Sequence, residues 1–108
     1  MAKDKTPQTG GIEFSERYDR EDDIYYVTFK TGEPSCVMEH DDKLLLEIGV
    51  FTGRPTGFRI LNFSKHRQEV AGFAKFLKNL FRLAKDRATA ESQVMENRMG
   101  QFLEKVSA

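Results

Sequence analysis

The densest group of potential metal ligands lies in an acidic segment near the start of the chain. Four carboxylates fall within five residues there: Asp19, Glu21, Asp22 and Asp23. Carboxylate oxygens suit Ca²⁺ and Mg²⁺, but the segment lacks the glycine and the terminal glutamate that a calcium-binding loop carries at fixed spacing. We therefore interpret the segment as a solvated turn and predict no metal site in it.

Cys36 and His40 come nearest to a nucleophile and its base. They share one face of a predicted strand, but four residues at about 3.3 Å per residue put them about 13 Å apart, too far for a thiolate–imidazole pair. His40 with Asp41 and Asp42, or with His66, lacks the paired spacing of metal ligands. The sequence therefore predicts no catalytic residue, no metal ion and no cofactor.

Three consecutive basic residues, Lys65, His66 and Arg67, begin the predicted helical part of the chain. Cations in a first helical turn oppose the helix dipole by about 0.3 to 1 kcal/mol each, where Asp or Glu would be expected after a Ser64 cap. Free backbone N–H groups at this end, together with Lys65 and Arg67, could hold an anion such as a phosphate or a partner's carboxylate. We treat these three residues as a candidate anion-binding site.

Further basic residues follow along the predicted helix. They are Lys75, Lys78, Arg82, Lys85 and Arg87. A basic helix face can bind nucleic acid, but 17 Lys and Arg balance 17 Asp and Glu, so the net charge is zero and no global field attracts a polyanion. We interpret this face as solvated and do not expect nucleic-acid binding.

The elements that position these residues belong to one domain. The chain of 108 residues is long enough for a single core. We predict a disordered leader over residues 1–11, which are polar and without periodicity, and a single α+β domain over residues 12–108. A single cysteine, no signal segment and no apolar stretch of about 20 residues favour a cytoplasmic protein without a membrane span.

Residues 12–63 alternate in a way that is typical of strands. Five strands are predicted, over residues 12–18, 24–30, 35–40, 44–51 and 56–63. No connection between them is long enough for a parallel crossover, so we expect an antiparallel five-stranded β-meander, with the apolar stretch 44–51 in its centre.

Two stretches of this region resemble the small bacterial DUF2283 family. The segment YDREDDIYYVTF, residues 18–29, is similar to the family's opening YDxExDxLYIxF, and residues 44–65, ending TGFRILNFSK, are similar to its apolar strand followed by GIEILxxSK. The resemblance covers residues 18–65. It implies a small β-meander domain in a family without an established activity, and, by analogy with members that look like partners of small toxin-like proteins, a role in protein interaction.

The stretch 70–84 has the clearest helical period. Its apolar face is formed by Val70, Phe73, Ala74, Leu77, Leu80, Phe81 and Ala84. The same phase continues to Val106, and no glycine or proline occurs between Ala84 and Gly100. We therefore expect one continuous helical extension over residues 65–106, packed on one sheet face.

Such a helix would be about 60 Å long, whereas five strands make a sheet only about 20 to 25 Å wide. The overhanging half would expose apolar side chains unless a second subunit covered them. We therefore predict a homo-oligomer, most simply a dimer. The predicted oligomer interface consists of Phe76, Leu83, Met95, Met99, Phe102 and Val106.

A two-helix hairpin is the alternative to the continuous helix. The turn would lie at residues 86–89, with Thr89 capping a second helix and Glu91 in its first turn. An oligomer is less strongly required in that case.

Function is expected to follow from these surfaces. The outer sheet face, with Ile24, Tyr26, Leu45, Phe51, Leu61 and Phe63, is apolar enough to indicate a further partner, either a second copy or another protein. We therefore predict a non-catalytic homo-oligomeric interaction module. The alternative is an enzyme or ligand-binding protein with a site at the oligomer interface, formed by His40, His66, Asp41 and Arg59.

Overall fold

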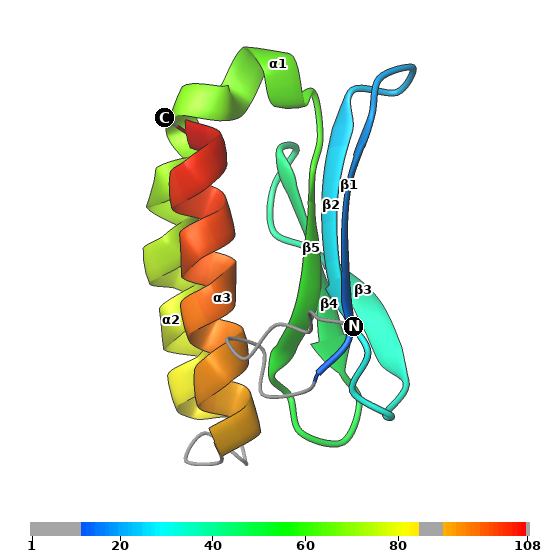
Figure 1. Ribbon diagram of the computed structural model, residues 1–108, viewed down its shortest axis with the longest axis vertical. Helices are drawn as coiled ribbons and strands as arrows, with labels where there is room; N and C mark the ends of the chain where they lie inside the picture. The colour runs from blue at the N-terminus through cyan, green and yellow to red at the C-terminus, as the bar shows by residue number, and fades with distance from the viewer. Residues whose placement is uncertain (1–11, 85–89, 108) are drawn as a thin grey trace, which may run out of the picture.

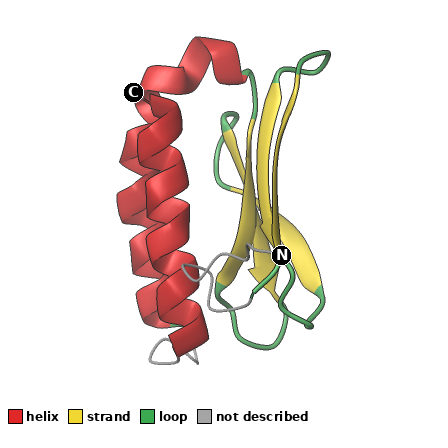
Figure 2. Ribbon diagram, in the orientation of Figure 1, coloured by secondary structure: helices red, strands yellow, loops and turns green. Residues whose placement is uncertain are grey.

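The computed structural model describes residues 12–84 and 90–107, which form a sheet layer and a helical layer. The helices cover one face of the sheet (Figures 1 and 2), so the predicted α+β fold is confirmed. The elements are β1 (Phe14–Asp19), β2 (Ile24–Phe29), β3 (Ser35–Glu39), β4 (Leu44–Gly49), β5 (Pro55–Ile60), the short helix α1 (Phe63–His66), the 3₁₀ helix η3 (Arg67–Gly72), α2 (Phe73–Leu83) and α3 (Ala90–Ser107).

The five strands lie in the order β1-β2-β5-β4-β3, and every neighbouring pair is antiparallel. The antiparallel sheet is as predicted, but the simple meander order is wrong because β5 inserts between β2 and β4. The connection from β2 to β3 must therefore pass two strands, or about 14 Å at about 4.8 Å per strand spacing. Residues 30–34 can span this distance when nearly extended, at about 3.3 Å per residue. A long crossover is unnecessary because both strand ends lie at the same end of the sheet.

β5 is the middle strand of the sheet, whereas the sequence placed 44–51 there. All of its residues except Arg59 are buried. Gly57 makes room on this strand, since a Cβ at that position would lie 2.6 Å from Oε1 of Glu47 and 2.6 Å from the carbonyl oxygen of Val27. The Glu47 side chain of β4 can therefore lie across β5.

The core lies between the inner sheet face and the helices. It contains Tyr25, Val27, Phe29, Leu44, Leu46, Phe58 and Ile60 from the strands and Val70, Leu77, Phe81, Met95, Met99, Phe102 and Leu103 from the helical layer. The alternation predicted for the strands supplies the first group, and the face predicted for 70–84 supplies much of the second. Phe14 of β1 packs on Phe102 of α3 with ring centroids 5.5 Å apart, so α3 lies over the β1 side of the sheet.

The helical extension is not one continuous helix. α2 ends at Leu83, and α3 runs back antiparallel beside it (Figure 1). The longest dimension of the molecule is 36 Å, which excludes a 60 Å helix. The hairpin alternative is therefore correct, although its turn and Thr89 lie outside the described residues, as does the predicted leader.

The hairpin changes the environment of the predicted oligomer interface. Met95, Met99 and Phe102 are buried within the chain, and Val106 and Phe76 are partly buried against the core. Of the six predicted residues, Leu83 is the exposed one, at 80%. The expectation that the end of the helix needs a second subunit for cover is wrong, because α2 and the sheet already shelter that end.

Truncation of Met99 tests this packing. Met99→Ala removes a fully buried side chain, so we expect the free energy of unfolding to fall by about 2 to 5 kcal/mol. The matched control Leu83→Ala removes an exposed side chain and should change it by less than about 0.5 kcal/mol. Urea denaturation measures both values, and equal losses for the two variants would contradict the hairpin.

Candidate functional site

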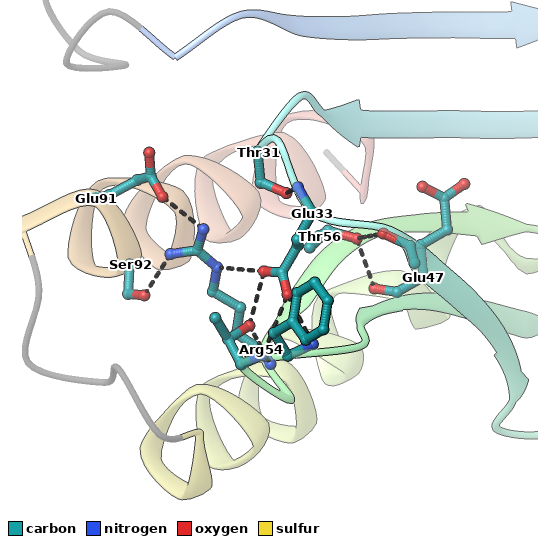
Figure 3. A network of polar contacts seen from close by, with 10 residues as sticks. Thr31, Glu33, Glu47, Arg54, Thr56, Glu91 and Ser92 are labelled. Atoms are coloured by element: carbon teal, nitrogen blue, oxygen red, sulfur yellow. Dashed lines mark hydrogen bonds and ion pairs between the residues drawn. The ribbon is translucent and has the colours of Figure 1, made fainter.

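The most deeply buried charge among the described residues belongs to Arg54, which begins the approach to β5. Its side chain is 3% exposed, and its guanidinium joins three segments of the chain (Figure 3). Nε lies 3.5 Å from Oε2 of Glu33, in the connection between β2 and β3. Nη1 donates to the Ser92 hydroxyl at 2.9 Å, and Nη2 donates to the Glu91 carboxylate, both in the first turn of α3. Arg54 therefore ties the start of α3 to the end of the sheet.

Glu33 anchors the short connection over residues 30–34, which passes β5 and β4. Its Oε1 accepts hydrogen bonds from the backbone N–H groups of Phe51 and Thr52, at 3.0 and 3.1 Å, and its Oε2 accepts the Thr52 hydroxyl at 2.9 Å. Burial alone would raise the pKa of the Glu33 carboxyl, but these hydrogen bonds and the nearby Arg54 hold the pKa below its ordinary value. Glu33 is therefore an ionised partner for Arg54.

Two turns of the same sequence pattern supply this pair of charges. Residues 31–34 read TGEP and residues 52–55 read TGRP. In both turns the glycine has a positive φ, 83° for Gly32 and 76° for Gly53, and the threonine hydroxyl accepts the backbone N–H two residues on. The variable position carries Glu33 in one turn and Arg54 in the other. Sequence reasoning treated both stretches only as turns, and the repeated pattern with opposite charges is the signal that would have paired them.

The acidic segment between β1 and β2 has a structural role. Asp19 accepts the backbone N–H groups of Glu21 and Asp22, which closes the turn. Asp23, in a left-handed conformation with φ 57°, accepts the backbone N–H and the hydroxyl of Ser64 at the start of α1. No group of three or more His, Cys, Asp or Glu side chains within 12–84 and 90–107 is placed to hold a metal ion.

Two of the three predicted anion-binding residues, His66 and Arg67, have side-chain partners within the chain. The N–H group of Ser64 at the start of α1 donates to Asp23, an internal anion that occupies the place we assigned to a ligand. His66 Nδ1 lies 2.9 Å from Oε2 of Glu69, and Oε1 of the same carboxylate accepts a hydrogen bond from Lys43 Nζ at 2.7 Å. Arg67 Nε donates to the Val106 carbonyl oxygen at 2.8 Å, at the C-terminal end of α3, where a cation is favoured by the helix dipole.

Lys65 is exposed, and α1 has only four residues. Arg67 links the start of η3 to the end of α3, and Glu69 links His66 to Lys43 in the β3–β4 turn.

The residues proposed for a site at a subunit interface have separate contacts. His40 stacks on Phe76 of α2 with ring centroids 4.0 Å apart. Asp41 accepts the backbone N–H groups of its own turn, His66 pairs with Glu69, and Arg59 pairs with Glu47 at 3.3 Å. Cys36 on β3 is exposed. None of these contacts within the described residues brings a nucleophile and a base together.

The outer face of the sheet is more polar than predicted. Tyr26 lies beneath two guanidinium groups, with the Cζ atoms of Arg17 and Arg59 at 4.5 and 5.8 Å from its ring centroid. Ile24, Leu45 and Leu61 are half-buried on or beside this face. Two members of the predicted apolar set lie elsewhere. These are Phe63, which stacks on Tyr25 of the core with centroids 5.2 Å apart, and Phe51, which lies in the β4–β5 turn and is 67% exposed.

Three of the basic residues on the predicted helix face are exposed on α2: Lys75, Lys78 and Arg82. The other two, Lys85 and Arg87, lie outside the described residues. Within the part of the chain that the structure describes, no helix is long and apolar enough to cross a membrane.

Comparison of the chain with models of protein families, with curated proteins and with solved structures gives no match. The resemblance to the DUF2283 family therefore stays a prediction from the two motifs.

Replacing Arg54 tests whether the buried network stabilises the fold. Arg54→Met leaves Glu33 buried beside an apolar side chain, so we expect a loss of about 3 to 5 kcal/mol in the free energy of unfolding. Arg59→Met on β5 is the matched control, since Arg59 also pairs with a glutamate but is 35% exposed, and it should cost about 1 kcal/mol or less. Urea denaturation of both variants makes the comparison. Similar losses would show that the network is no more important than an ordinary surface pair.

The Asp23 cap predicts a pH dependence of stability. Hydrogen bonds from the Tyr18 hydroxyl and from Ser64 lower the pKa of the Asp23 carboxyl in the folded protein. A lowered pKa means that the stabilisation is present above the unfolded value, near 3.8, and is lost as the pH falls through the folded value. Asp23→Asn keeps a residue that tolerates the left-handed conformation but removes the charge.

We expect Asp23→Asn to melt below the wild type at pH 7 and the difference to shrink steadily below the unfolded pKa of aspartate. Thermal melts across this pH range measure it. Asp22→Asn is the control, because Asp22 is exposed and its carboxylate has no hydrogen bond to the described residues. A difference for Asp23→Asn that stays constant with pH would rule out the charged cap.

Proposed function

We propose that the protein is a non-catalytic protein–protein interaction module of the cytoplasm, and that it associates with copies of itself, most simply as a dimer. The proposal follows from two features of the described residues. Both histidines are engaged in contacts within the chain and neither contact joins one to the exposed Cys36, and most of the exposed large apolar side chains gather in one region.

The exposed apolar side chains carry the proposal. Among the described residues they are Tyr18, Val37, Met38, Val50, Phe51 and Leu83. Four of the six lie on β3 or in the turn that follows its neighbour β4. Val50 is joined to the start of β3, because its N–H donates to the Pro34 carbonyl oxygen at 2.8 Å. Single exposed apolar residues are ordinary, but a contiguous group on one edge is typical of an interaction surface.

The sequence resemblance points in the same direction. The DUF2283 family, which residues 18–65 resemble, has no established activity, and some of its members look like partners of small toxin-like proteins. A different protein could occupy the same edge, and its identity would then come from a separate capture experiment. Self-association needs no second component and is tested first.

The mass of the protein in solution tests this function. We expect light scattering after size-exclusion chromatography to give twice the chain mass of 12.4 kDa at micromolar concentration, with dissociation on dilution. The exposed edge is the physical reason, because burying it removes apolar area from water. A mass of one chain at every concentration would refute self-association.

A further inference from the structure

We propose that β3 is the contact between the two copies, and that it pairs antiparallel with β3 of a second copy around Val37. The two sheets would then join into one continuous sheet across the dimer axis. The inference rests on the self-association proposed above and names the surface and the partner.

The hydrogen bonds of β3 leave one set of backbone groups directed away from the sheet. The His40 N–H donates to Leu44 at 3.0 Å, and the Val50 N–H donates to Pro34 at 2.8 Å. In the register of β3 with β4, Met38 lies opposite Leu46, and these two hydrogen-bonded pairs continue the same register at either end of β3. Because hydrogen-bonded pairs alternate along an antiparallel ladder, residues 34, 36, 38 and 40 face β4. The N–H and C=O groups of Ser35, Val37 and Glu39 therefore face outward.

This outward set is symmetric about Val37. In an antiparallel pairing of two copies, Val37 lies opposite the partner's Val37, and Ser35 lies opposite the partner's Glu39. All three outward residues can then exchange both backbone hydrogen bonds, which gives about six across the interface. Cys36 falls opposite the partner's Met38 on the other face. No like charges oppose each other in this register, so β3 is complementary to itself.

β3 lacks most of the features that protect a sheet edge from pairing, and its one charged residue is Glu39. All of its residues are exposed, and it contains no proline and no lysine. The register shift of the sheet lies between β4 and β5, so β3 itself is free of a bulge. Natural sheets place such features on edges that must stay unpaired, because an open edge is a template for another strand. Their absence from β3 favours pairing.

The opposite edge of the sheet differs. β1 carries Glu16, Arg17 and Asp19, and Glu16 lies near its middle. Burial alone would raise the pKa of the Glu16 carboxyl, but hydrogen bonds from Lys105 at 2.7 Å and from Tyr25 at 2.6 Å hold the pKa down and the carboxylate in place. Two copies paired around Glu16 would bring these carboxylates together, which is unfavourable. The charges therefore select β3 over β1 as the edge for a second copy.

A charge at Val37 tests the contact. Val37→Lys places two lysines opposite each other at the dimer axis, so we expect the dimer dissociation constant to rise about tenfold or more. Leu83→Lys is the control, because Leu83 is also an exposed apolar side chain, at 80% against 53% for Val37, and receives the same change at the end of α2, away from β3. Sedimentation equilibrium measures the constants, and circular dichroism confirms that both variants fold.

Dissociation of Val37→Lys alone supports the inference. If neither variant changes the constant, or if both raise it equally, pairing through β3 is overturned while self-association stands. If the wild type is itself a monomer throughout, the proposed function fails and this inference fails with it.

A disulfide then tests the register. In the double variant Cys36→Ser with Val37→Cys, the two new thiols lie across a hydrogen-bonded pair with Cα atoms about 5.5 Å apart, within disulfide range. Wild-type Cys36 is diagonal to its copy at about 7 to 8 Å, beyond easy bridging. We expect mild oxidation to link the double variant into a covalent dimer much faster than the wild type. Equal rates, or no linkage in the double variant, would overturn the proposed register.

Discussion

The fold depends on the buried ion pair between Arg54 and Glu33 at one end of the sheet. Five antiparallel strands in the order β1-β2-β5-β4-β3 require a connection that crosses the ends of two strands, and such a connection needs an anchor. Glu33 supplies it by binding the N–H groups of the β4–β5 turn, and Arg54 extends the same network to Ser92 and Glu91 at the start of α3. One guanidinium thus links the β2–β3 connection to the point where the second helix meets the sheet. A charge of this kind is costly to bury alone, which makes its partners as important as the arginine.

Local patterns predict the elements of this protein better than their arrangement. Alternation placed Val27, Leu44 and Leu46 on the inner face, and the helical period placed Leu77 and Phe81 in the core, because each pattern depends on neighbours in the sequence. Strand order depends on contacts between residues far apart, and nothing local to β5 says which strand it joins. The break after Leu83 has the same origin. The helical phase continues through it, so only the gain from packing Met95 and Met99 on α2 and the sheet decides that the chain turns back.

The sequence identifies an unusual basic cluster but not the residues that contact it. Lys65, His66 and Arg67 are unusual for a helix start because cations oppose the helix dipole there. The opposing charges come from Glu69 and from the carbonyl end of α3, which lie three and about forty residues away, and the acidic turn supplies the cap through Asp23. His66, Arg67 and Asp23 each have a partner within the chain. The repeat of TGEP and TGRP, with opposite charges at the third position, is the pattern in the sequence that indicates the pairing of Glu33 with Arg54.

The helical layer and the sheet differ in size, as the sequence predicts, but the difference lies in another direction. The excess is in the width of the sheet across its strands and not in the length of a helix. Two packed helices lie about 8 to 10 Å apart and cover a width of about 20 Å, whereas five strands at about 4.8 Å spacing occupy about 24 Å. The two widths differ by nearly one strand spacing, so a strand at one edge lies at the margin of the helical layer. α3 lies over β1, where Phe102 packs on Phe14 and Lys105 binds Glu16, so the strand at the margin is the one at the other edge. This is β3, and it has both open backbone groups and exposed apolar side chains because the width of the hairpin leaves it without cover.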